Sequence, residues 1–342
     1  MKRPNLLVIM SDEHQGRALG CAGHPLVCTP HLDALASRGT RFENAYTPSP
    51  ICVPARASFA TGRYVHQTRL WDNAMPYTGS IKGWGHALQE KGVPVESIGK
   101  LHYRDAEDPA GFDVEHIPMM VQDGIGMAWA LIRDEDQRLQ PGKRMLGDHI
   151  GAGHSKYTDY DQAVTRHTRS WLETRAASDD ERPWCLYVGL VAPHFPLIVP
   201  QEYFDLYPAD QLAPTKLRPK DGYRRHPWVE KLNAVMDTEA HFVDEEERLR
   251  AISSYFGLCS WLDFNVGDIL SALQENGYLD DTTVVYTSDH GDNVGARGLW
   301  GKSNLYQESV HIPLIMAGPD IPVGVCQTPV SLLDLSKTIA LH

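Results

Sequence analysis

The sequence lacks long apolar runs, and it lacks an excess of positive charge. Apolar stretches such as Leu6 to Met10 are far shorter than the roughly 20 residues that a membrane-spanning helix needs, so no membrane span is expected. Acidic residues outnumber basic residues, and the net charge is −12. Because a generic nucleic-acid-binding protein is normally basic, nucleic acid is not an expected partner.

Paired cysteine motifs are also missing. The six cysteines are scattered, with no CxxC pair and no spacing typical of a disulfide framework. The apolar stretch after Asn5 is too short for the core of a signal peptide, and acidic residues follow it at once. A cytoplasmic location, where thiols stay reduced, is the simplest interpretation.

The composition is that of a globular protein. The chain has 342 residues, of which 42% are hydrophobic and 22% are charged, which is enough to bury a large core and is unlike a disordered chain. The sequence contains no internal repeat, and no shift in its composition is sharp enough to mark a linker between domains. We therefore predict a single α/β domain over residues 1–342.

Strand patterns alternate with helix patterns along the chain. Short apolar or β-branched runs predict strands at 6–10, 40–46, 94–98, 185–191, 282–287 and 312–317. Caps and three- to four-residue apolar spacing predict helices at 29–39, 54–62, 85–90, 159–174, 249–273 and 332–341. Residues 104–155 and 196–243 have the composition of irregular surface loops. This alternation predicts a mostly parallel central sheet with helices on both faces.

Three predicted strands end in residues that can bind a cation or move a proton. These residues are Asp12, His194, and the pair Asp289-His290. Ligands of open α/β sheets bind at the carboxyl ends of the strands, and carboxylates there supply hard oxygen ligands for a metal ion. The alternative is that each Asp merely caps the turn after its strand. Two acidic strand ends, one of them followed by His, favour a metal site.

The segment Cys52-Val53-Pro54-Ala55-Arg56 is the sharpest local signal. A proline in the first turn of a helix leaves Cys52 at the helix N-terminus, where backbone N–H groups favour an anion. Arg56 lies close enough in sequence to stabilise that charge. The alternative is a small buried cysteine at a junction between a loop and a helix, which is the common role of an arbitrary cysteine.

Together these motifs resemble the type I sulfatases of the alkaline phosphatase superfamily. The family signature is Cys or Ser, any residue, Pro, Ser or Ala, and Arg, followed shortly by Thr-Gly-Arg. Residues 52–56 and 61–63 fit it in full. Further matches, in the same order, are the opening strand with its Asp at 5–12, Gly-Lys-Leu-His at 99–102, Pro-His at 193–194, and Ser-Asp-His-Gly at 288–291 with Lys302.

The resemblance implies a nucleophile made from Cys52. A separate maturation enzyme would oxidise this residue to Cα-formylglycine, whose hydrated aldehyde attacks sulfur and later expels sulfate. One divalent cation would be bound by Asp12, Asp289, His290 and the oxygen on residue 52. The sulfuryl oxygens would be held by Lys100, Lys302 and Arg56. The leaving group would be protonated by His194 or His102.

The sequence departs from the family pattern in several places. Glu13 stands where the family often has a second Asp ligand, and His290 stands where many members have Asn. Imidazole suits transition metals, so Mn²⁺ or Mg²⁺ are alternatives to the expected Ca²⁺. Asn73 is a candidate substrate contact. The family fold also has a small C-terminal subdomain, which we expect to be missing or truncated because the chain ends at His342.

The expected activity is hydrolysis of a small or aryl sulfate ester. The sequence leaves open whether the protein forms a homo-oligomer. A phosphonate monoester or phosphodiester hydrolase on the same scaffold is the alternative. Such relatives lack the Lys-x-His element, so Lys100 and His102 favour sulfate. In an extended backbone these two side chains would point to the same side. A non-catalytic metal-binding protein is a third interpretation, which the intact Cys52 and Arg56 disfavour.

Overall fold

The computed structural model describes residues 4–128, 145–213, 215–235 and 237–342. In this part of the chain an eight-stranded sheet has the order β11-β2-β10-β9-β1-β7-β4-β5. Its strands are β1 (Asn5–Asp12), β2 (Gly39–Phe42), β4 (Val95–Lys100), β5 (Val114–Met119), β7 (Cys185–Pro193), β9 (Thr282–Ser288), β10 (Leu314–Ala317) and β11 (Gly324–Cys326). Strand β10 is antiparallel to both neighbours, and the other pairings are parallel.

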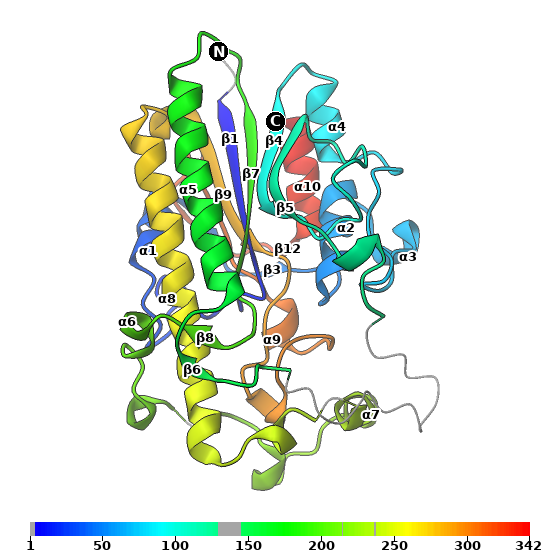
Figure 1. Cartoon of the computed structure of the whole chain (residues 1–342), viewed down its shortest axis with the longest axis vertical. Coiled ribbons are helices and arrows are strands. Elements are labelled where there is room, and N and C mark those ends of the chain that lie inside the picture. The colour runs from blue at the N-terminus through cyan, green and yellow to red at the C-terminus, as the bar shows by residue number, and fades with distance from the viewer. Residues whose placement is uncertain (1–3, 129–144, 214, 236) are drawn as a thin grey trace.

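Helices cover both faces of this sheet (Figure 1). On one side lie α1 (Pro30–Ser37), α5 (Lys156–Ala176) and α8 (Glu245–Glu275), and on the other lie α2 (Cys52–Thr61), α4 (Trp84–Gln89) and α10 (Leu332–Leu341). Shorter helices are α3 (Val65–Thr68), α6 (Gln201–Phe204), α7 (Pro227–Val235) and α9 (Gln307–Val310). Two small parallel pairs are formed by β3 (Ala45–Tyr46) with β12 (Val330–Ser331) and by β6 (Gly151–Ala152) with β8 (Ile198–Val199).

The central strand β1 has an uninterrupted apolar run because both of its faces are buried. Alternate side chains of a strand point to opposite faces. Accordingly, Leu7 and Ile9 pack into the core beneath α8, whereas Leu6, Val8 and Met10 pack into the core beneath α2 and α4. The helices on both sides therefore fix the position of the strand end at Asp12.

Local capping explains where the longest helix begins. The side chain of Asp244 accepts a hydrogen bond from the backbone N–H of Glu247, and three glutamates occupy the first turn of α8. Carboxylates are favourable there because the helix N-terminus carries a partial positive charge.

No helix among the described residues is both long and apolar enough to span a bilayer.

The predicted fold class is confirmed, with corrections at the level of single elements. The strand predicted at 40–46 is two strands, β2 and β3, and the helix predicted from Pro54 begins at Cys52. The two segments predicted as loops contain β5, β6, β8, α6 and α7, although residues 129–144 lie outside the described residues. The carboxyl ends of β1, β7 and β9 meet at one edge of the sheet, where the candidate site lies.

Candidate active site

Cys52 is the first residue of α2, and its side chain is 1% exposed. Ile51 before it is extended and offers no side-chain cap, so a distant residue caps the helix: the Asn73 side-chain oxygen accepts a hydrogen bond from Val53 N–H at 3.1 Å. Gly62 ends the helix in the left-handed conformation, at a φ of 64°, which glycine adopts without steric cost. The sequence therefore places Cys52 at a buried helix N-terminus, aimed at the sheet.

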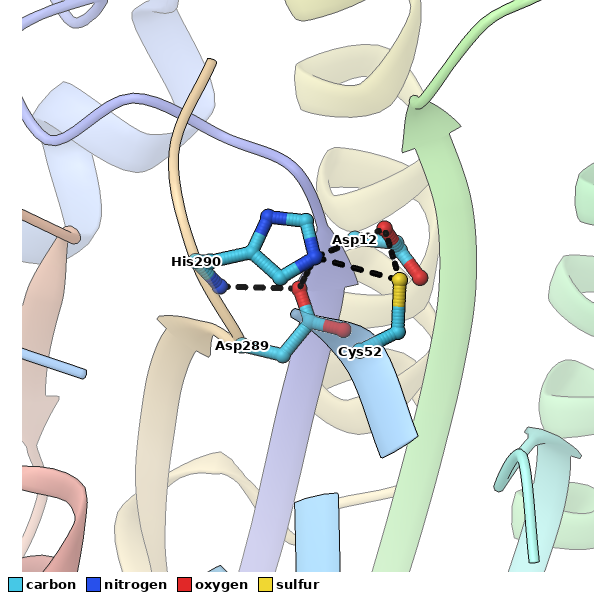
Figure 2. A group of neighbouring side chains, drawn as sticks. All are labelled: Asp12, Cys52, Asp289 and His290. Atoms are coloured by element: carbon cyan, nitrogen blue, oxygen red, sulfur yellow. Dashed lines mark hydrogen bonds and ion pairs between the residues drawn. The ribbon is translucent and has the colours of Figure 1, made fainter. Parts of the chain in front are cut away.

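Four ligand atoms converge at this point (Figure 2). One atom each of Asp12, Cys52, Asp289 and His290 lies within 4.8 Å of the others, and all four residues are buried. His290 Nε2 lies 3.1 Å from Cys52 Sγ, 3.7 Å from Asp12 Oδ1 and 3.6 Å from Asp289 Oδ1. Separations above 3.5 Å are long for hydrogen bonds. They fit ligands that share one cation at about 2.0–2.6 Å.

Arg56 lies behind this cluster, fully buried, and its donors are all used within the protein. Its Nε donates to Asp289 Oδ2 at 2.8 Å, and its Nη1 donates to the carbonyl of Lys100 and to the hydroxyl of Tyr187, each at 3.0 Å. Its Nη2 contacts Asp12 Oδ2 and the carbonyl of Ser11, each at 3.4 Å. The guanidinium therefore fixes the two carboxylates. That Arg56 also holds a sulfuryl oxygen stays a prediction.

Lys100, the last residue of β4, also faces Asp12. Its Nζ lies 2.5 Å from Asp12 Oδ2, and the lysine side chain is 2% exposed. Burial alone would raise the pKa of Asp12, but Lys100 and the neighbouring cations hold that pKa well below its usual range. The pKa of Lys100 is raised: burial opposes the charge, and Asp12 more than offsets it. Asp12 is therefore ionised, as a metal ligand must be.

Glu13, His194 and Lys302 form an adjoining group. Lys302 Nζ lies 2.9 Å from Glu13 Oε2, and His194 Nε2 lies 3.4 Å from the same oxygen. The other carboxylate oxygen of Glu13 is buried and has no hydrogen-bond partner among the described residues. Burial raises the pKa of Glu13 well above its usual range, although Lys302 opposes the shift. Glu13 thus shares a cluster with Asp12 and His194 rather than with His290.

His102 lies beside Lys100, but not as the sequence suggested. Its φ is 59°, so the backbone is left-handed there and the expected extended Lys-x-His geometry is wrong. Its Nδ1 is buried without a hydrogen-bond partner in the described part of the chain. Burial and the charge of Lys100 lower the pKa of His102 well below its usual range, so the ring is neutral.

Sequence reasoning missed three supporting residues. The hydroxyl of Tyr187 accepts a hydrogen bond from Arg56. The carboxylate of Asp161 on α5 accepts hydrogen bonds from the backbone N–H groups of Val191 and Ala192 at 2.7 and 2.8 Å. These two bonds fix the end of β7 just before His194. Asp292 accepts the N–H of Gly301 at 3.1 Å and so ties down the loop that carries Lys302. Burial raises the pKa of Asp161 to about 7. None of these residues lies in a motif.

The donor set fits a divalent cation. Two carboxylates and one imidazole meet at the strand ends, and Cys52 Sγ marks where an oxygen on a modified residue 52 would lie. Burial and the charge of Asp12 raise the pKa of the thiol to about 12, so the unmodified side chain is a neutral thiol at pH 7.

Comparison with known proteins identifies the family of this chain. The sulfatase family model matches residues 4–342. The chain belongs to the sulfatase family. Choline-sulfatase of Rhizobium meliloti is 36% identical over 99% of this chain and 67% of its own length. Arylsulfatase K of Danio rerio is 30% identical over 98% of this chain and 64% of its own length. The chain thus spans about two thirds of the length of these sulfatases.

Solved structures agree on the fold. A phosphonate monoester hydrolase of Agrobacterium radiobacter matches 98% of this chain and 73% of its own chain, with a TM-score of 0.79 and 22% identity. The sulfatase-like protein YidJ of Bacteroides fragilis matches 98% of this chain and 73% of its own, with a TM-score of 0.68 and 25% identity. Because one fold carries both sulfatases and phosphonate hydrolases, the choice of substrate must come from the site.

Proposed function

We propose that this sulfatase-family chain hydrolyses sulfate esters to an alcohol and inorganic sulfate, with a nucleophilic oxygen on residue 52. One observation carries the proposal: Cys52 begins a buried helix directly opposite Asp12, Asp289 and His290, with Lys100 beside them. The oxygen would come from oxidation of Cys52 to Cα-formylglycine by a separate maturation enzyme. The maturation pentapeptide and the Thr-Gly-Arg tail at 61–63 support this step.

One divalent cation completes the proposed site. Asp12, Asp289, His290 and the oxygen on residue 52 would hold it, with Ca²⁺ preferred for the carboxylates and Mn²⁺ or Mg²⁺ as alternatives because of the imidazole. Bound there, the cation would favour loss of a proton from the nucleophile and offset negative charge. Glu13, with one buried oxygen unpaired, is the candidate for a further ligand.

The remaining residues have distinct proposed roles. Lys100 and Lys302 would hold the sulfuryl oxygens, since each ammonium has one close carboxylate partner and further N–H groups to offer. His102 is the stronger candidate for contact with the leaving oxygen, because its Nδ1 has no partner among the described residues, but its neutral ring would have to gain a proton before it could protonate that oxygen. In His194, by contrast, Nδ1 already donates to the carbonyl of Phe195 at 2.5 Å.

Phosphonate monoester hydrolysis is the second candidate, favoured by the structural likeness to the Agrobacterium enzyme. A phosphonate monoester or phosphodiester carries an additional organic group where a sulfate monoester has a bare oxygen. The buried ammonium groups of Lys100 and Lys302 would lie against that group. The lysines therefore favour a substrate whose three non-bridging oxygens can all accept hydrogen bonds.

A matched set of sulfate, phosphate and phosphonate esters with one alcohol tests the proposal. Enzyme coexpressed with a maturation enzyme should carry an aldehyde at residue 52, seen by mass spectrometry of that peptide, and should cleave the sulfate ester with the highest kcat/KM. Cys52→Ala should abolish turnover, whereas Cys28→Ala, at an exposed cysteine, should not. Faster phosphonate turnover, or full activity with an unmodified thiol, would overturn the proposal.

The metal assignment has its own test. Asp289→Ala should lose both bound metal and activity, with metal content measured by mass spectrometry of the purified protein. Normal metal stoichiometry in this variant would contradict the assignment.

All six cysteines are free, which supports the proposal that the protein works in the reducing cytoplasm.

A further inference from the structure

We infer that the alcohol part of the substrate is a compact apolar group without negative charge, bound in a cavity between Trp71 and Trp228. This inference rests on the proposed sulfate ester hydrolysis and adds the substrate class. The cavity has a volume of about 630 Å³, within the range of small-molecule binding sites. It is formed by the segments before α2, after α3, on α7 and before α9.

The wall of the cavity is joined in sequence to the proposed site, although Cys52 itself does not line it. The wall includes Ile51, the residue directly before Cys52, and Ser303, the residue directly after Lys302. The backbone N–H of Ser303 donates to the carbonyl of Pro50 at 2.9 Å, which joins these two parts of the wall. A narrow second cavity reaches Lys302 itself and shares Leu232 and Ser303 with the larger one. An ester whose sulfate lies near Lys302 can therefore place its alcohol part in the larger cavity.

Most of the wall is apolar or aromatic. The side chains of Trp71 and Trp228 are each 56% exposed, and Leu305 is 82% exposed. Large apolar side chains gathered around one exposed hollow mark a binding site more often than isolated ones do. Covering them with an apolar group removes that surface from water, which stabilises the complex.

The wall also disfavours a second anion. None of the described residues that line this cavity is Lys or Arg; Asp72 contributes a carboxylate and His226 contributes an imidazole. Arg297 lies behind the wall, where its guanidinium covers one face of the Tyr306 ring at 4.2 Å and pairs with Glu308 at 2.6 Å. Its guanidinium is thus engaged there, on a carboxylate that Lys216 also contacts at 3.1 Å. A polysulfated sugar would find no lysine or arginine in this wall to pair with its extra anionic groups.

Matched alkyl sulfates test this inference. Ethyl sulfate lacks a ring, 2-phenylethyl sulfate adds one, and 2-(4-carboxyphenyl)ethyl sulfate adds a charge remote from the reacting bond. The phenyl ring should raise kcat/KM roughly tenfold or more over ethyl sulfate. The carboxylate should remove most of that gain. Trp71→Ala and Trp228→Ala should lower kcat/KM for 2-phenylethyl sulfate by a larger factor than kcat/KM for ethyl sulfate.

Phe264→Ala is the matched control, since this side chain is 50% exposed on α8, away from the cavity lining. Thermal unfolding checks that each variant folds. If no sulfate ester is hydrolysed, the proposed function fails. If ethyl sulfate is cleaved but the ring gives no gain, or glucose 6-sulfate is preferred, the cavity inference alone fails. A (trimethylammonio)ethyl ester cleaved more than tenfold faster than its neutral 3,3-dimethylbutyl analogue would overturn it in favour of a cation site.

Discussion

Residue by residue, the centre of the site balances buried charges. Asp12 and Asp289 face Arg56 and Lys100, and all four side chains are at most 2% exposed. Buried charges persist when they are paired and hydrogen-bonded. Arg56 is fully engaged, whereas the ammonium of Lys100 has N–H groups left over. We therefore propose that Arg56 positions the two carboxylates and that Lys100 offers its remaining N–H groups to a substrate.

Lys100→Ala should lower kcat/KM for a sulfate ester by roughly 2–4 kcal/mol of transition-state stabilisation, the range for loss of one preorganised donor. The matched control is Lys82→Ala, because Lys82 is 74% exposed and pairs with Glu90 at the surface. Steady-state kinetics of both variants make the comparison. Unchanged sulfate hydrolysis in Lys100→Ala would contradict the assigned role.

Glu115 gives a prediction about stability, away from the site. Burial, and then the carboxylates of Asp108 and Asp105, raise its pKa to about 7 in the folded protein from 4.5. A carboxyl with a raised folded pKa makes the folded state lose stability as pH rises from the unfolded pKa through the folded one. Glu115→Gln should therefore increase the free energy of unfolding more at pH 8 than at pH 5.5, as measured by urea denaturation. An equal effect at both pH values would refute this.

The chemistry of the residues was more predictable than their geometry. Asp12, Cys52, Asp289 and His290 were predicted together because strand ends and a helix start are visible in sequence. The left-handed φ of His102 was not predicted: histidine adopts positive φ more often than most non-glycine residues, but the residue type alone does not mark the position. Tyr187 was missed because a tyrosine inside a buried strand looks like core until its hydroxyl partner, Arg56, is placed.

At the scale of elements, α8 shows how a helix supports the site. It packs on β7 and α5, and its buried face includes Leu262, which is fully buried, while Phe264 two residues later is half exposed. The three- to four-residue periodicity predicted this helix because burial of one face selects apolar residues at that spacing. The antiparallel direction of β10 was not predictable, because an apolar run carries no record of strand direction.

Leu262→Ala should destabilise the protein by about 2–5 kcal/mol through lost burial and the cavity left behind. Phe264→Ala on the same helix should cost less than half as much, because half of that side chain already meets solvent. Urea unfolding followed by circular dichroism compares them. Similar losses in the two variants would mean that α8 is not packed as described.

At the scale of the whole molecule, the net charge of −12 opposes an anionic substrate, whereas the buried cations of the site attract it. Salt screens exposed charges strongly, since the Debye length falls from about 30 Å at 0.01 M to about 8 Å at 0.15 M, and it screens buried ones less. Raising the ionic strength over this range should therefore increase kcat/KM for a monoanionic sulfate ester, by roughly twofold to tenfold. A zwitterionic sulfate ester is the control and should change little. A decrease for the monoanion would show that surface cations guide it instead.

The burial of Cys52 would set a time limit on the proposed maturation of this residue. In the folded chain Cys52 is only 1% exposed, so its sulfur is too enclosed for another protein to reach. Its cover includes His290, which is synthesised 238 residues later. At about 5–20 residues per second, translation leaves an interval of roughly 12–50 s between the synthesis of Cys52 and the synthesis of His290. On the proposed chemistry, the speed of the ribosome and of folding, as well as the affinity of the maturation enzyme, would decide what fraction of molecules becomes active.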